Sequence, residues 1–210
     1  MTVGGEGRLA VAVLAAGRGS RLGGETPKPL ALLQGRPLVA HALDAALRSG
    51  LRPVFLVVGH RGEEVAAEAG PGVSVVPNPR WEGGLSTSLA AAIAAVAENH
   101  EIDGLAVGLA DQPGLGPESY RRLASAHQQG AVVAVATYDG VRGHPVMLGR
   151  PVWEEALALE GDAGARSLLA RPEVVEVPCD GTGAAADVDT PADLAALEAL
   201  TNLGSFLRPR

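Results

Sequence analysis

In the segment Arg8-Leu-Ala-Val-Ala-Val-Leu14 every residue after the arginine is apolar, and a cluster of glycines follows at positions 17, 19, 23 and 24. A strand buried on both faces, as in a parallel sheet, has such an uninterrupted pattern, whereas a strand with one wet face alternates apolar and polar residues. We therefore predict that this segment is a buried strand of a parallel sheet, with the glycines in the loop at its carboxyl end.

Short apolar runs of the same kind recur at 53–58, 73–76, 104–109, 131–136 and 174–177. Stretches with a helical pattern lie between and after them, at 38–49, 62–69, 86–97, 117–129, 152–159, 163–170 and 191–200. Strands that alternate with helices predict an α/β fold, here a three-layer, Rossmann-like, mostly parallel sheet with right-handed crossovers. No repeat or linker divides the sequence, so we expect one domain over residues 1–210, with loose ends at 1–7 and 201–210.

The composition excludes several classes of protein. A formal net charge of -7 over 210 residues argues against nucleic-acid binding, which usually needs a basic face. The single cysteine, Cys179, excludes an internal disulfide framework and a multi-cysteine zinc site. The first residues are not those of a signal peptide, and no apolar run approaches the roughly 20 residues of a membrane span. We expect a soluble, cytoplasmic protein with no membrane partner.

Lys28 is the only lysine among the 17 basic residues of the chain, and it follows the glycine cluster directly. Lysine carries a compact, rotatable ammonium, whereas arginine carries a broad planar guanidinium, so a lone lysine beside glycines suggests a tight phosphate site. From the count alone, a chain so rich in arginine could equally have kept a single lysine here by chance. The residues around Lys28 have to distinguish the two.

Two common phosphate-binding loops do not match this region. A Walker loop ends in Gly-Lys followed by Ser or Thr, and the chain contains no Gly-Lys pair. A dinucleotide fingerprint that starts at Gly17 needs a third glycine at position 22, which is Leu22. Clustered glycine amides can nevertheless cradle phosphate oxygens, so the loop remains a candidate site for another kind of nucleotide.

Asp111 comes directly after the apolar run 104–109, too far before Pro117 to cap the next helix. Magnesium prefers oxygen ligands and often takes one or two carboxylates together with substrate phosphates, so a metal ligand is the better interpretation. Asp187 or Asp189 could supply the second carboxylate. Asp189 or Thr190 could instead cap the helix predicted from Pro191, and the sequence alone leaves these two roles equally open.

Three further motifs have an ordinary structural explanation as well as a functional one. Ser86, Thr87 and Ser88 stand at a predicted helix start, where one of them could be a cap, but three hydroxyls also suit a ribose or a phosphate. His144, in Gly143-His-Pro-Val-Met-Leu148, could be a packed turn histidine. The segment Gly161-Asp-Ala-Gly164 could be a loop that ends in a helix cap.

The pattern Leu14-Ala-Ala-Gly-x-Gly-x-Arg-Leu-Gly23 followed by Pro27-Lys-Pro-Leu30 resembles the signature of nucleotidyltransferases with a glycosyltransferase-A-like fold. The motifs taken together and in order resemble the molybdenum cofactor cytidylyltransferase branch of the MobA-like nucleotidyltransferases. This resemblance implies that the loop wraps the triphosphate of an incoming nucleotide and that Arg21 and Lys28 neutralise it. The implied nucleotide-binding residues are Leu14, Ala15, Ala16, Gly17, Arg18, Gly19, Lys28, Ser86, Thr87 and Ser88.

The same resemblance implies the reaction. Ala16 in place of a glycine is associated with CTP, and the Gly-His-Pro segment places His144 and Pro145 on the acceptor side. We expect transfer of CMP from CTP to the phosphate of molybdopterin with release of pyrophosphate, Mg²⁺ held by Asp111 with Asp187 or Asp189, and a molybdenum hydroxylase as recipient enzyme. The catalytic residues would be Arg21, Lys28 and Asp111.

Two alternatives stay open at this point. One is a nucleotidyltransferase that acts on a sugar phosphate or polyol phosphate, which would share the glycine loop and Asp111. The other is a non-catalytic protein that binds the cofactor or nucleotide and delivers it to a molybdoenzyme. The acceptor, the oligomeric state and the recipient enzyme are not encoded in any motif of the chain.

Overall fold

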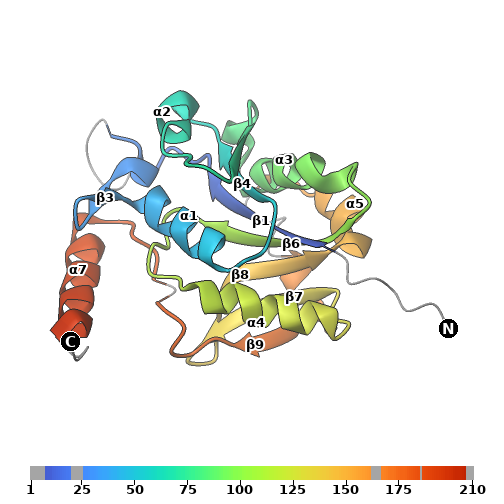
Figure 1. Cartoon of the computed structure of the whole chain (residues 1–210). Helices are drawn as coiled ribbons and strands as arrows, with labels where there is room; N and C mark the ends of the chain where they lie inside the picture. The colour runs from blue at the N-terminus through green and yellow to red at the C-terminus, as the bar shows by residue number, and fades with distance from the viewer. Residues whose placement is uncertain (1–7, 20–25, 162–166, 185, 207–210) are drawn as a thin grey trace.

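The computed structural model describes residues 8–19, 26–161, 167–184 and 186–206. Within these ranges the main sheet has seven strands in the order β5-β4-β1-β6-β8-β7-β9, with β1 (Arg8–Ala15) near its middle (Figure 1). The other strands are β4 (Val54–Val58), β5 (Val73–Pro77), β6 (Ile102–Leu109), β7 (Val133–Tyr138), β8 (Val141–Gly149) and β9 (Val175–Pro178). A small antiparallel pair, β2 (Leu32–Leu33) and β3 (Arg36–Pro37), lies outside this sheet. The predicted α/β fold with a mostly parallel sheet is confirmed.

Helices cover both faces of the sheet, as Figure 1 shows. The odd-numbered side chains of β1, such as Val11 and Val13, belong to a core with α1 (Leu38–Arg48), α2 (Gly62–Ala66) and α4 (Pro117–Gln128). The even-numbered ones, such as Ala12, pack with α3 (Leu85–Ala97) and α5 (Trp153–Leu157). The two cores explain why the first strand has no polar face, because each of its sides is covered by helices.

The structure differs from the sequence prediction at β8. This strand is antiparallel to both β6 and β7 and lies between them. Its pairing with β7 jumps from Val135–Val146 to Thr137–Arg142, so His144 and Pro145 lie within an irregularity of the ladder. Proline donates no ladder hydrogen bond and is tolerated at such a bulge, and bulges reorient side chains. The Gly-His-Pro sequence, which is typical of a turn, therefore concealed an interior strand.

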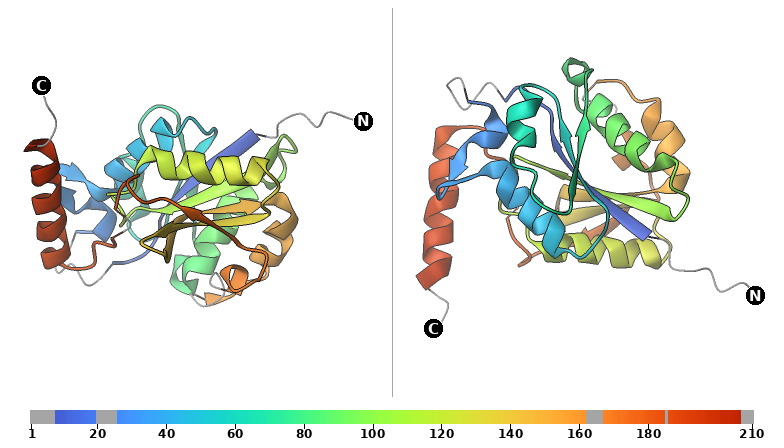
Figure 2. Two further views of the ribbon diagram at one scale, coloured as in Figure 1. Left: turned by 90° about the horizontal axis from the view of Figure 1, so that it is seen from below. Right: turned by 45° about the horizontal axis from the view of Figure 1, so that its top comes forward.

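The last helix, α7 (Pro191–Phe206), stands at one end of the molecule beside β2 and β3 (Figure 2). It continues past Leu200, so the prediction of a loose end from residue 201 is wrong for residues 201–206. Leu197 of α7 and Val188 before it cluster with Leu33 and Leu38. The short helices are η2 (Lys28–Leu30), η3 (Trp81–Gly83) and η4 (Arg150–Val152).

The helix predicted at 163–170 is only partly visible, because residues 162–166 lie outside the described part of the chain and residues 167–169 are helical. The helix predicted at 152–159 corresponds to η4 followed by α5. No helix in the described part of the chain is long and apolar enough to cross a membrane.

Candidate active site

Two adjoining cavities lie at the carboxyl ends of β1 and β6 in the described structure. The smaller, here called the loop pocket, has a volume of about 350 Å³ and lies between the glycine loop after β1 and the turn before α3. The larger, here called the apolar cavity, has a volume of about 900 Å³ and extends toward β8. Leu14, Leu85 and Leu109 line both of them. Ligands of open α/β sheets bind at this edge, so both cavities are candidate binding sites.

The glycine loop forms one wall of the loop pocket. The residues from Leu14 to Gly19 line it together with Lys28, so this part of the predicted nucleotide site is brought together. Gly19 has a φ of +59°, and a Cβ built on it would lie 2.2 Å from the Cβ of Lys28. Only glycine satisfies both constraints. The loop thus closes directly over the lysine stem. Arg21 lies outside the described residues.

Lys28 lies between two carboxylates that are far apart in the sequence. Its Nζ donates to Asp111 Oδ2 at 2.6 Å and to Asp189 Oδ1 at 2.7 Å, and the residue is only 8% exposed. Burial alone would lower the pKa of Lys28, but the hydrogen bonds that its ammonium donates to both aspartates, with their negative charges, outweigh this effect and the pKa is raised. The ammonium is therefore charged at neutral pH and is held by Asp111 and Asp189.

The structure separates Asp187 from Asp189. Asp187 accepts a hydrogen bond of 2.7 Å from Gln112 Nε2 and lines the apolar cavity, whereas Asp189 pairs with Lys28. The capping role falls to Thr190, whose Oγ1 accepts from the backbone N–H of Asp193 while Asp193 Oδ2 accepts from the N–H of Thr190. This reciprocal pair is a capping box, and it leaves the carboxylate of Asp189 directed at Lys28.

The arrangement of Asp111 and Asp189 fits a divalent cation. Two carboxylates face a single positive group, the Lys28 ammonium, which acts as a stand-in for an ion between them. In the described structure no group of three or more His, Cys, Asp or Glu side chains could hold a metal by itself. A cation here would need further oxygen ligands from phosphates, which is how magnesium is commonly bound with nucleotides.

The hydroxyl cluster does not cap α3. The helix begins at Leu85 after Gly84, without a side-chain cap, so the capping interpretation of Ser86, Thr87 and Ser88 is wrong. Asn78 Nδ2 donates to Thr87 Oγ1 at 2.9 Å and to Ser88 Oγ at 3.1 Å. Of the three hydroxyl residues, Ser88 lines the loop pocket. Asn78 is not among the predicted site residues, although it lies only eight residues before Ser86.

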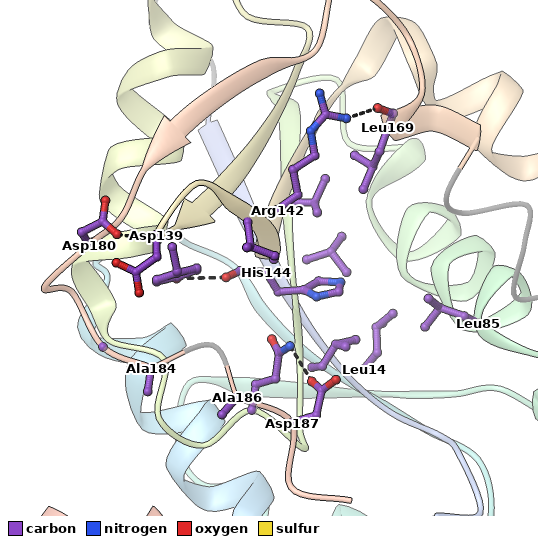
Figure 3. Close-up of a pocket in the computed structure, with 18 of the residues that line it drawn as sticks. Leu14, Leu85, Asp139, Arg142, His144, Leu169, Asp180, Ala184, Ala186 and Asp187 are labelled. Atoms are coloured by element: carbon purple, nitrogen blue, oxygen red, sulfur yellow. Dashed lines mark hydrogen bonds between the residues drawn. The ribbon is translucent and has the colours of Figure 1, made fainter. Parts of the chain in front are cut away.

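His144 lies in the wall of the apolar cavity, where its ring projects toward the space between Arg142, Leu14 and Leu85 (Figure 3). Burial lowers the pKa of the imidazole, against the opposing effect of Asp187 and Asp111. The ring is therefore neutral at pH 7, with one nitrogen as donor and the other as acceptor. Pro145 is buried beside it in β8.

Most side chains that line the apolar cavity are apolar, and they include Leu89, Val107, Val146 and Leu168. The charged ones are Asp139, Arg142, Asp180 and Asp187. Asp139 and Asp180 lie on one side of the cavity, as Figure 3 shows. The backbone N–H of Asp139 donates a hydrogen bond to Asp180 Oδ1 at 2.7 Å. A cavity of this volume and lining suits a flat, mainly apolar ligand of moderate size.

The fold and the motifs at the carboxyl edge of its sheet place the chain among the nucleotidyltransferases. Residues 11–177 match the family described as the MobA-like NTP transferase domain, and the chain belongs to this family.

Relatives with different names are similar to this chain. Nicotine blue oxidoreductase of Paenarthrobacter nicotinovorans is 36% identical over 85% of this chain and 90% of its own length. Molybdenum cofactor cytidylyltransferase of Escherichia coli is 28% identical over 72% of this chain and 78% of its own length.

A solved structure, Rv0371c of Mycobacterium tuberculosis, is 30% identical with a TM-score of 0.78, covering 93% of this chain and 100% of that one. Another structure of that protein is a complex with manganese; it is 28% identical with a TM-score of 0.74, over 91% of this chain and 98% of that one.

Proposed function

We propose that this protein transfers CMP from CTP to the terminal phosphate of molybdopterin, with release of pyrophosphate. The observation that carries the proposal is the adjoining pair of cavities, one lined by a glycine loop with Lys28 and Asp111, the other large and apolar. A transferase needs a nucleotide and an acceptor side by side, and the shared walls at Leu14 and Leu109 provide that arrangement.

CTP is the proposed donor and molybdopterin the proposed acceptor. The loop sequence with Ala16 is the form that resembles the CTP-using branch, and a relative named molybdenum cofactor cytidylyltransferase covers most of the chain. A pterin is a flat heterocycle, which suits a mainly apolar cavity with a neutral donor and acceptor at His144.

The chemistry needs little from the protein beyond placement and charge. The attacking phosphate is already anionic near neutral pH, so no general base is required. Lys28, and Arg21 by the family resemblance, would hold the triphosphate in line with the acceptor. Asp111 and Asp189 would hold Mg²⁺, which supplies positive charge to the reacting phosphate oxygens when bound.

Lys28 has to change partners for this to occur. Its ammonium neutralises both carboxylates, Asp111 at 2.6 Å and Asp189 at 2.7 Å. With a metal ion held by Asp111 and Asp189, Lys28 would pair with the triphosphate instead, so that each anion would have a cation. Metal and nucleotide should therefore bind together more tightly than either alone.

The test is a screen of pyrophosphate release with CTP, GTP and UTP against molybdopterin, sugar phosphates and polyol phosphates, with Mg²⁺ present. Release only with CTP and molybdopterin is the expected result. Turnover with a sugar or polyol phosphate instead would establish the second type of transferase. Calorimetric binding of CTP without any turnover would favour a non-catalytic carrier of nucleotide or cofactor.

A second candidate function is an oxidoreductase that acts on a flat aromatic compound in the apolar cavity. The cavity lining favours such a ligand, and a relative that is 36% identical over 85% of this chain is named for nicotine blue. Oxidation of NADH or NADPH on addition of that dye, measured by absorbance, would support this candidate. The dye left unchanged by enzyme and nicotinamide cofactor would count against it.

A further inference from the structure

Arg18 and Trp81 contact each other in the wall of the loop pocket. The guanidinium carbon of Arg18 lies 5.6 Å from the centre of the Trp81 ring, within range of a cation–π contact. Both residues line the pocket, Arg18 from the glycine loop and Trp81 from η3 before α3. The contact thus joins the two segments between which a nucleotide would lie.

The backbone fixes the position of Trp81. A Cβ built on Gly59 would lie 2.5 Å from Trp81 Cβ and 2.7 Å from the carbonyl oxygen of Ala16, so the three segments touch without room for another atom. The His60 ring contacts the Trp81 ring with centroids 5.1 Å apart and planes tilted by 56°. The indole is therefore a fixed surface and the flexible Arg18 side chain rests on it.

Arg18 also differs from Lys28 in its partners. The Lys28 charge is already taken up by Asp111 and Asp189, whereas no ion pair in the described part of the chain involves Arg18. A guanidinium can stack on an aromatic ring and still direct its N–H groups at a phosphate in its own plane. The contact with Trp81 leaves those donors available to an anion in the pocket.

We propose that Trp81 is a positioning residue that holds the Arg18 guanidinium over the loop pocket, where it pairs with the outer phosphates of a nucleoside triphosphate. This inference rests on the proposed function to the extent that a nucleotide occupies this pocket. It assigns Trp81 a role that acts through Arg18. The inference also predicts that the Trp81 indole contributes to the affinity for the triphosphate group and not to the affinity for the base.

The experiment measures the affinities of Mg-CTP and CMP by calorimetry for the wild-type chain and for Trp81→Leu, Trp81→Phe and Arg18→Ala. We expect CTP to bind about tenfold more weakly to Trp81→Leu and to Arg18→Ala, since an oriented cation is lost. Trp81→Phe, which keeps an aromatic face, should recover part of the loss. CMP, which lacks the outer phosphates, should bind all the variants within about twofold of wild type, on the same scale.

Two further variants make the result specific. The double variant Trp81→Leu with Arg18→Ala should lose no more than either single change, because both break one interaction. Arg80→Ala is the matched control, since Arg80 is exposed, adjoins Trp81 and is outside the pocket wall; its CTP affinity should equal that of wild type. Melting temperatures identify any variant that fails to fold, and Trp81→Phe and Arg18→Ala then carry the test.

The outcomes separate this inference from the proposed function. Equal losses of CTP and CMP affinity in Trp81→Leu would show that the ring contacts base or ribose and would overturn the inference alone. Unchanged CTP affinity in that variant, or fully additive losses in the double variant, would do the same. No binding of Mg-CTP by the wild-type chain would overturn the proposed function and the inference together.

Discussion

The loop pocket and the apolar cavity share a wall but are built in different ways. Much of the loop pocket comes from one contiguous segment, Leu14–Gly19, with Lys28 shortly after it. The apolar cavity is lined by side chains from β1, α3, β6, β8 and the segment after β9. A site made mainly by a local loop can be recognised as a motif, whereas a site made by distant side chains becomes visible only after folding.

The two regions also differ in charge. Lys28 in the loop pocket is kept charged, since its hydrogen bonds to Asp111 and Asp189 raise its pKa. The titratable ring of the apolar cavity is kept neutral, since burial lowers the pKa of His144. This difference agrees with a triphosphate in one and a largely uncharged heterocycle in the other, and the following changes test it.

The largest effect is expected from Lys28→Met, which keeps the apolar stem and removes the charge. Pyrophosphate release should fall by about 10² or more, the usual cost of losing a charge aimed at a reacting phosphate. Mn²⁺ alone, followed by its paramagnetic resonance signal, should bind more tightly than in wild type, because the carboxylates of Asp111 and Asp189 are no longer neutralised. Weaker Mn²⁺ binding would contradict the exchange of partners.

Lys28→Arg is the companion variant. A planar guanidinium does not fit between two carboxylates spaced for a single Nζ at 2.6 and 2.7 Å. We expect activity well below that of wild type, and full activity would show that an ammonium is not required.

Asp187→Asn and Asp189→Asn should separate the two regions, although the residues are neighbours in the sequence. Asp189→Asn weakens the pair with Lys28, so kcat/KM for CTP should fall by about tenfold with the KM for the acceptor unchanged. Asp187→Asn can still accept from Gln112 and should mainly raise the acceptor KM, by roughly threefold. Steady-state kinetics with each substrate varied in turn checks both, and the reverse pattern would assign the two aspartates the other way round.

Gly19→Ala tests the closure of the loop over Lys28. The left-handed backbone at φ +59° and the 2.2 Å approach to Lys28 should lower stability by about 1–2 kcal/mol or more. Gly17→Ala is the matched control, because a Cβ there meets nothing within 4 Å. Denaturant unfolding without nucleotide compares them, and equal stability of the two variants would show that the contact with Lys28 does not constrain the loop.

The smallest effect is a pH dependence from His144. Because its pKa in the folded protein is below the ordinary value of 6.5, the unfolded chain binds more protons between the two values. Stability should therefore decrease as the pH falls below about 6.5, and His144→Gln should reduce this slope. Thermal unfolding from pH 7.5 to 5 measures it, with His100→Gln at an exposed position as control. Identical slopes for wild type and His144→Gln would argue against a lowered pKa of His144 in the folded protein.

The fold could be predicted because apolar runs and helical stretches alternate along the chain, and β1 has no polar residue after Arg8. The strand β8 could not be predicted, since Gly143 and Pro145 are turn residues and only the irregular pairing with β7 makes room for them. Within the candidate site, the glycine loop and Lys28 could be predicted because they lie together in one short segment of the sequence.

Long-range partners could not be predicted. The sequence offered Asp187 and Asp189 as equal candidates for the second metal ligand. Only the packing of the segment before α7 shows that Asp187 accepts from Gln112 and that Asp189 accepts from Lys28. The contact between Arg18 and Trp81 likewise depends on how close Gly59 lets two loops approach. No periodicity or spacing carries that information.

The attachment of α7 has a consequence for the order in which the site is completed. Glu198 accepts a hydrogen bond from the Gln34 backbone, and Leu197 packs with Leu33, so the helix ties Asp189 to the hairpin that follows Lys28. During synthesis on the ribosome, the lysine emerges long before its second carboxylate. A nascent or truncated chain that ends before Asp189 has the glycine loop but only Asp111 to balance Lys28. The ion-pair cluster is thus assembled only once nearly the entire polypeptide has been made.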